Sequence, residues 1–163
     1  MLRIFPETPD DTPEVEYLYD LAFAPGRQAL SSYRLRDGVP PVAELCLVAR
    51  GEEGALAGAI RYWPVLIGAA QALLLGPVAV HPTRQGEGVG RLLIRDSLER
   101  AEALGWKRVL LVGDAPYYKR FGFEQLRRLK LPPPTNPERV LGKELIVGAF
   151  DNISGNVSAL KLD

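Results

Sequence analysis

The sequence feature that most constrains the fold is a succession of strand, glycine-rich turn, amphipathic helix and strand in the middle of the chain. The apolar run Ala70–Val80 predicts a strand, and Gly88–Leu104 places apolar residues on one helical face and charged residues on the other. Gly105 supplies a helix stop, and Arg108–Val112 predicts a buried strand. Together these segments predict a βαβ-like unit.

The segments on either side of this unit indicate hairpin-connected strands, which a doubly wound sheet lacks. Gly76-Pro77 interrupts Ala70–Val80 and predicts an edge, a bulge or the end of pairing, because proline cannot donate to a ladder. The further strands that we expect are Leu2–Phe5, Ala43–Ala49, Leu56–Trp63, one from Phe123 and Glu144–Phe150. The further helices that we expect are one from Thr12-Pro13-Glu14 to a stop at Pro25-Gly26, Arg27–Tyr33 and Ala115–Phe121. Loops are expected at Pro64–Gly68 and Pro132–Pro134, and a surface tail at Asp151–Asp163. The chain thus belongs to a mixed α/β (α+β) class.

The charge balance argues against a dedicated nucleic-acid binder. Lys plus Arg and Asp plus Glu each number 20, so the formal net charge is zero, whereas such binders usually carry a basic excess. The one cysteine, Cys46, lies in an apolar run and suggests a small buried side chain. With one histidine besides, His81, neither a zinc site nor a Ser-His-Asp or Cys-His site is easily built.

The chain shows no targeting or membrane signal. The N-terminus lacks the basic segment and apolar core of a secretory signal, and its longest apolar stretch is too short to span a bilayer. We therefore expect one cytoplasmic domain over residues 1–163, with no membrane partner.

The glycine-rich turn before the long helix is the candidate ligand-binding segment. Gly86, Gly88 and Gly90 alternate there, so backbone N–H groups can turn toward a ligand without obstruction by side chains. The positive end of the helix and the charges of Arg84 and Arg91 complete a cradle for a pyrophosphate. The alternative is a loop that merely joins strand to helix. The turn lacks the lysine that a Walker loop requires, and its glycine spacing differs from that of the dinucleotide-binding fingerprint. Both of these phosphate-binding classes are therefore disfavoured.

Two motifs identify a resemblance. Gln85-Gly86-Glu87-Gly88-Val89-Gly90 resembles the cofactor loop of the GCN5-related N-acetyltransferases, and Tyr117–Phe123 is similar to the aromatic-Tyr-x-x-x-Gly-Phe segment of that family. The helix and strand between them have the family's order. The subgroup that the chain most resembles is a poorly characterised bacterial one with Gly-Asp, Tyr-Tyr and Arg-Phe-Gly-Phe.

The resemblance implies a mostly antiparallel sheet of about six to seven strands, splayed between strands 4 and 5 and flanked by about four helices. Acetyl-CoA would be the co-substrate, without a metal. Its pantetheine arm would follow the strand that ends at Val80, chiefly through backbone groups, and its pyrophosphate would meet the glycine turn. The implied cofactor-binding residues are Val78, Ala79, Val80, Gln85, Gly86, Glu87, Gly88, Val89, Gly90 and Arg91.

The resemblance also implies direct transfer of the acetyl group to a primary amine in a ternary complex. Tyr118 occupies the position of the general acid, and a phenol with a pKa of about 10 is protonated at neutral pH. The family's strand glutamate is missing, so the base is left open between Glu44, on the preceding strand, and a water chain. His81 is read as structural, and Asp114 as the cap of the short helix.

The acceptor should lie in a groove lined by the first helices, the Pro64–Gly68 loop and the segment after Phe123, with Pro132–Pro134 as a further wall. The sequence does not separate a small-molecule amine from a peptide amine. The alternative function is a non-catalytic acyl-CoA sensor of the same fold. Because dimers are common in the family, a homodimer is among the expected partners. The candidate acceptor residues are Arg27, Ser31, Tyr33, Arg61 and Tyr62.

Overall fold

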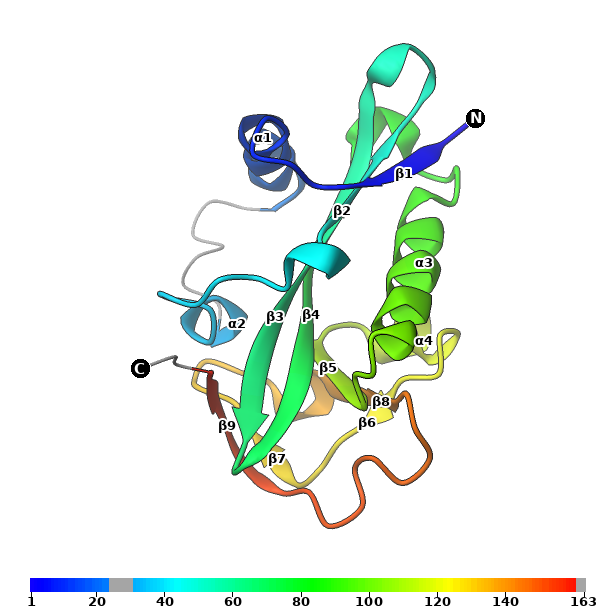
Figure 1. The fold of residues 1–163 in the computed structure, drawn as a ribbon. Coiled ribbons are helices and arrows are strands. Elements are labelled where there is room, and N and C mark those ends of the chain that lie inside the picture. The colour runs from blue at the N-terminus through cyan, green and yellow to red at the C-terminus, as the bar shows by residue number, and fades with distance from the viewer. Residues whose placement is uncertain (24–30, 161–163) are drawn as a thin grey trace.

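A nine-stranded sheet organises the chain in a computed structural model that describes residues 1–23 and 31–160 (Figure 1). The strand order is β1-β2-β3-β4-β5-β8-β6, and β9 pairs with both β3 and β7. The strands are β1 (Arg3–Pro6), β2 (Leu47–Arg50), β3 (Leu56–Ile67), β4 (Ala70–Val80), β5 (Arg108–Val112), β6 (Glu124–Gln125), β7 (Leu129–Lys130), β8 (Val140–Glu144) and β9 (Gly155–Ala159). The helices are α1 (Thr12–Ala22), α2 (Ser31–Arg34), α3 (Val89–Ala103) and α4 (Ala115–Lys119). The predicted helix stop at Pro25-Gly26 and the predicted helix start at Arg27 lie outside the described residues.

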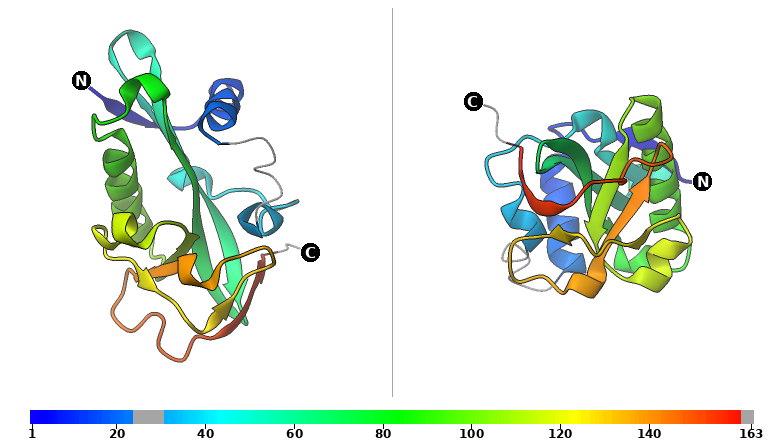
Figure 2. Two further views of the ribbon diagram at one scale, coloured as in Figure 1. Left: turned by 180° about the vertical axis from the view of Figure 1, so that it is seen from behind. Right: turned by 90° about the horizontal axis from the view of Figure 1, so that it is seen from below.

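The two long helices cover opposite faces of the sheet (Figures 1 and 2). On β2, Leu47 and Ala49 face the cluster that contains Leu93 of α3, while Val48 between them faces the cluster that contains Val15 of α1. This alternation follows from the period of two in a strand, which sends successive side chains to opposite faces. Both sides of the central strands are therefore buried.

The strands β3 and β4 form a long antiparallel hairpin with a bulge in the middle. Ile60 pairs with Val78 and Tyr62 with Leu75, so Gly76-Pro77 on β4 lies opposite the single residue Arg61. The bulge is one of the outcomes that the proline predicted. Buried Tyr19 of α1 donates its hydroxyl to the Pro77 carbonyl at 3.1 Å, which fixes the helix against the bulge.

The sheet opens between β4 and β5. These two strands are parallel, and their ladder is limited to Leu73 with Val109 and Leu74 with Leu110. The C-terminal half of β4 therefore separates from the end of β5. The mixed α/β class, the mostly antiparallel sheet and the splay between the fourth and fifth strands are confirmed. Within the described residues the strands number nine rather than about six to seven.

Several predicted boundaries are wrong. Pro64–Gly68 is not a loop, because β3 continues to Ile67 and pairs with β4 throughout. Residues 43–45 form a 3₁₀ turn before β2 rather than part of a strand. The strand predicted at Glu144–Phe150 is instead β8, which ends at Glu144. The predicted surface tail contains β9, where Val157 is buried.

Candidate functional site

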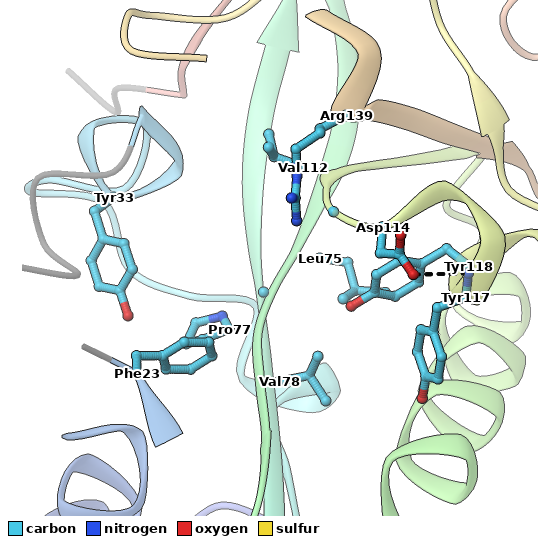
Figure 3. A pocket seen from close by; sticks show the side chains of 12 residues that line it. Phe23, Tyr33, Leu75, Pro77, Val78, Val112, Asp114, Tyr117, Tyr118 and Arg139 are labelled. Atoms are coloured by element: carbon cyan, nitrogen blue, oxygen red, sulfur yellow. Dashed lines mark hydrogen bonds between the residues drawn. The ribbon is translucent and has the colours of Figure 1, made fainter. Parts of the chain in front are cut away.

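Two cavities follow the opening between β4 and β5. The first has a volume of about 470 Å³ and extends from Gln85 and Gly90 at the glycine turn to the tyrosines of α4. The second, of about 430 Å³, continues from these tyrosines to Tyr33 and Arg139 (Figure 3). Both are lined by Phe23, Val78, Tyr117 and Tyr118, so they form one continuous groove.

The floor of the groove is the free edge of β4. The His81 N–H bonds the Ala57 carbonyl of β3 at 2.8 Å, so residue 81 directs its backbone groups toward β3. Because successive residues of a strand direct these groups to opposite edges, those of Ala79 also face β3, and those of Val78 and Val80 face the opening. The side chain of Gln85 already donates to the Val80 carbonyl at 3.2 Å. Ala79 also lines the first cavity, but its backbone groups face β3 and are not directed toward the opening.

The glycine turn closes one end of the groove. Gly86 and Gly88 have φ angles of +84° and +79°, and Gly88 is the N-cap of α3, without a side-chain cap. Such positive φ angles favour glycine. Gly90 lines the groove, where an added Cβ would lie 3.3 Å from the Tyr117 hydroxyl and 3.5 Å from Val80 Cγ2. The glycines adopt this turn without strain and place no side chain over the N–H groups at the helix start, so the turn fits a pyrophosphate.

Of the two arginines expected to complete the cradle, Arg84 and Arg91, the first is already paired within the protein. Arg84 bonds Glu87 at 2.9 Å and lies against Gly51, so its charge is already engaged. Arg91 is exposed in the first turn of α3, and no ion pair within residues 1–23 and 31–160 involves it. The Val89 side chain is buried in the core, so only its backbone can serve a ligand. Arg91 is therefore the cation that the structure leaves available here.

Tyr118 lies where the two cavities meet. Its ring packs edge-on against Tyr117 and Phe123, with centroids 5.0 and 5.8 Å apart. Burial raises the pKa of the Tyr118 phenol to about 12, and the neighbouring Tyr117 acts in the same direction, while Arg139 opposes the shift. A Cβ on Gly113 would lie 2.6 Å from the Tyr118 ring, so this glycine makes room for it. The phenol is thus held at the groove in its protonated form.

The short helix that carries Tyr118 begins as predicted. Asp114 is its N-cap, and the carboxylate accepts the Tyr117 N–H at 3.3 Å. Among the described residues that line the second cavity, Asp114 is the one carboxylate. Glu44 does not lie on a strand: it is exposed in the 3₁₀ turn at 43–45 and lines neither cavity, so the structure contradicts it as the base.

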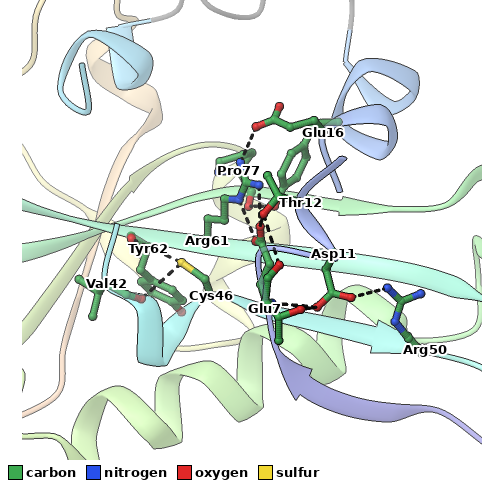
Figure 4. Close-up of polar contacts among 12 residues, drawn as sticks. Glu7, Asp11, Thr12, Glu16, Val42, Cys46, Arg50, Arg61, Tyr62 and Pro77 are labelled. Carbon is green, nitrogen blue, oxygen red and sulfur yellow. Dashed lines mark hydrogen bonds and ion pairs between the residues drawn. The ribbon is translucent and has the colours of Figure 1, made fainter. Parts of the chain in front are cut away.

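Of the predicted acceptor side chains that the structure describes, only Tyr33 lines the groove. Tyr62 is buried in the core and bonds Ser97 at 2.8 Å. Arg61 points instead toward the N-terminal segment, where it bonds both oxygens of Glu7 at 2.8 and 2.9 Å and Glu16 at 2.8 Å (Figure 4). This pairing fixes α1 against β3. Arg27 and the side chain of Ser31 lie outside the described part of the chain.

Sequence reasoning missed Phe23 and Arg139. Phe23 follows the last residue of α1, and Arg139 ends the 3₁₀ turn Pro137–Arg139 before β8. The predicted wall Pro132–Pro134 lines neither cavity. Phe23 and Arg139 belong to no recognisable motif. Both reach the groove only through the packing of the complete fold.

The remaining candidate groups have local roles. The His81 Nδ1 contacts the Thr83 hydroxyl at 2.8 Å and accepts the Thr83 N–H at 3.2 Å, which caps the turn Pro82–Arg84. Cys46 is buried, and burial raises the pKa of its thiol to about 11. The described residues contain no cluster of three His, Cys, Asp or Glu side chains suited to a metal ion. In that same part of the chain, no helix has both the length and the apolar character required to cross a bilayer.

Comparison with known proteins identifies the family to which the chain belongs. The profile of the acetyltransferase (GNAT) domain matches residues 43–125, and the chain belongs to this family of N-acetyltransferases. The uncharacterized N-acetyltransferase YhbS of Escherichia coli (strain K12) is 32% identical over 121 residues, which are 72% of this chain and 71% of YhbS. The mycothiol acetyltransferase of Nocardia farcinica (strain IFM 10152) is 27% identical over 154 residues, 84% of this chain and 50% of that enzyme.

Solved structures agree with this assignment. The crystal structure of Escherichia coli YhbS in complex with CoA has a TM-score of 0.81 and 27% identity, and the match covers 98% of this chain and 89% of that one. A GNAT family acetyltransferase from Brucella melitensis in complex with acetyl-CoA has a TM-score of 0.64 and 33% identity, with 93% and 99% covered. The resemblance to the bacterial subgroup is therefore confirmed, and the chain is an acetyl-CoA-dependent acyltransferase.

Proposed function

We propose that residues 1–163 form one N-acetyltransferase domain that transfers the acetyl group of acetyl-CoA to a primary amine by direct transfer in a ternary complex. The observation that carries the proposal is the continuous groove from the glycine turn, past the free edge of β4, to Tyr118. Acetyl-CoA supplies an activated acyl group in its thioester. The crystal structures of the two relatives in complex with CoA and acetyl-CoA support the same ligand for this groove.

The groove offers each part of acetyl-CoA a matching surface. We assign the pyrophosphate to the backbone N–H groups of Gln85–Gly90, supported by the helix start and the charge of Arg91. We assign the pantetheine arm to the free edge of β4, where Val78 and Val80 direct their backbone groups. The amides of the arm would bond these groups as an added strand does.

The residues around Tyr118 supply the catalytic chemistry. A backbone N–H on the free edge of β4 stabilises the oxyanion that forms when a neutral amine attacks the thioester carbonyl. Tyr118 donates its phenolic proton to the departing sulfur, and the proton lost by the amine passes to solvent, from which the phenolate recovers its own. The products are the N-acetylated amine and CoA. Binding both reactants in one groove removes much of the entropic cost of their encounter.

The first experiment is a calorimetric titration of the protein with acetyl-CoA, with ATP and NAD as controls. Saturable binding of acetyl-CoA alone is expected, followed by release of free thiol when a panel of primary amines is added. Binding of ATP or NAD in preference would contradict the cofactor assignment. Binding without thiol release for any amine would instead favour the acyl-CoA sensor.

A further inference from the structure

The acceptor end of the groove carries a cation whose role the transfer reaction does not explain. Arg139 lines the second cavity, and Figure 3 shows its guanidinium directed into the space that Tyr33 and Tyr118 flank. Its backbone carbonyl accepts the Gly113 N–H at 2.9 Å, so the end of β5 fixes its position. Within residues 1–23 and 31–160 no carboxylate forms an ion pair with it, Asp114 included.

The Arg139 side chain is exposed, and the cavity that it lines is otherwise largely apolar. Phe23, Leu75, Pro77 and Val112 line the same cavity of about 430 Å³. A guanidinium beside such a surface, without an internal counter-ion, favours an anionic ligand, and its planar fork matches the two oxygens of a carboxylate. The position of Arg139 therefore indicates that a ligand of the cavity brings a negative charge to it.

Acetyl-CoA does not bring that charge if it binds as proposed above. Its charged groups are phosphates, and these belong at the glycine turn, which closes the opposite end of the groove. The end that reaches Tyr118 consists of an uncharged thioester and acetyl group. The anion that Arg139 binds must therefore belong to the acceptor.

We propose that Arg139 binds the carboxylate of the acceptor, and that the acceptor is a small amino acid-like amine with an apolar body. This inference rests on the proposed acetyl transfer. Asp114, which lines the same cavity, adds the negative charge that attracts the ammonium form of the amine to the position beside Tyr118. A cation and an anion in a cavity that is otherwise lined largely by apolar side chains match an acceptor with both charges on one end.

The test compares matched pairs of acceptors that differ only in the carboxylate. L-phenylalanine is compared with 2-phenylethylamine, and L-leucine with 3-methylbutylamine, by measuring kcat/KM for acetyl-CoA-dependent thiol release. The parent protein, Arg139→Gln and Arg139→Lys are assayed beside Arg3→Gln, an exposed arginine on β1 that lines neither cavity. Thermal unfolding and the acetyl-CoA titration are run on every variant.

The parent should prefer the carboxylate-bearing member of each pair. Arg139→Gln should lower kcat/KM for that member by about 10- to 100-fold, the usual range for loss of a charged hydrogen bond, and Arg139→Lys by less. With the amine that lacks the carboxylate, the change should stay within about twofold, as for Arg3→Gln with either member. The dissociation constant for acetyl-CoA should not change.

Three results would overturn the assignment. One is equal loss of kcat/KM for both members of a pair, which would give Arg139 a role unrelated to a carboxylate. Another is weaker acetyl-CoA binding by Arg139→Gln, which would assign the residue to the co-substrate. The third is a protein that releases thiol with other primary amines but with no carboxylate-bearing member of either pair. Failure of the proposed function is distinguishable, since the parent would then either not bind acetyl-CoA or bind it without releasing thiol with any amine of the panel.

Discussion

At the scale of single residues, the chemistry depends most on the Tyr118 hydroxyl. If this group protonates the leaving sulfur, Tyr118→Phe should lower kcat by about 10²- to 10⁴-fold, the usual contribution of a general acid. The dissociation constant for acetyl-CoA should change little, because the ring and its packing remain. Steady-state kinetics and calorimetry measure the two effects. Tyr17→Phe, on the exposed face of α1 (65% exposed), is the matched control, and equal kcat in Tyr118→Phe and the parent would remove the hydroxyl from the mechanism.

The raised pKa of Tyr118 leads to a second expectation at this scale. With the pKa at about 12, the phenol keeps its proton below about pH 11, so its ionisation should not lower the rate in the range from pH 6 to about 10. Over that range kcat/KM should rise with pH and then level, because a larger fraction of the amine becomes neutral. A pH–rate profile tests this, and a falling limb centred below about pH 10 that disappears in Tyr118→Phe would contradict it.

The residues that sequence reasoning assigned correctly are those inside local motifs. Asp114 caps the tyrosine helix as predicted, because capping is decided by the chain within three residues. The roles predicted for Glu44, Arg61 and Tyr62 were wrong for the opposite reason. Whether a side chain faces a groove, an ion pair or the core depends on residues far away in the sequence. Arg139 was missed because it lies in a short turn without periodicity, more than a dozen residues beyond the last motif.

At the scale of the elements, the turn before α3 combines a backbone conformation with a binding surface. Gly88→Ala should destabilise the protein by about 1–2 kcal/mol, because alanine resists the left-handed conformation with φ of +79°, and should also weaken acetyl-CoA binding. Gly38→Ala is the matched control, since Gly38 has φ of +70°, open space around it and no contact with the groove. Its stability should fall by a similar amount, measured by urea unfolding, while its affinity for acetyl-CoA in calorimetry is unchanged. Equal affinities in the two variants would show that the turn is only a connector.

The elements that the sequence pattern predicted well are β4, α3 and β5, where an apolar or amphipathic pattern extends over most of the element. The predicted end of β3 is wrong because Pro64 favours a loop in the sequence pattern, yet lies within the strand. The Tyr62 carbonyl bonds the Val42 N–H, on the side away from β4, so Pro64 two residues later also directs its nitrogen away from β4. No bond between β3 and β4 is lost there, and the proline fits within the strand.

At the scale of the whole molecule, the sheet has more strands than the sequence predicted because its shortest strands have no pattern of their own. β6 and β7 contain two residues each, and their extended conformation depends on β8 and β9. β9 lies in a polar segment, and Val157 is its one buried residue. Short strands of this kind form only where the edge of another strand offers hydrogen-bond partners. For β9 that edge is the end of β3, at Val65–Ile67.

The docking of β9 gives the last prediction, which concerns the stability of the complete fold. Val157 pairs with Ile67 of β3 and is 4% exposed in the cluster that also holds Val65 and Leu110, whereas Val147 in the preceding turn is 98% exposed. Val157→Ala should therefore lower the free energy of unfolding by about 1–3 kcal/mol through lost apolar burial and the cavity left behind. Val147→Ala, the same chemical change without burial, should stay within about 0.5 kcal/mol of the parent. Urea unfolding measures both, and equal effects would mean that residues 155–159 do not belong to the folded core.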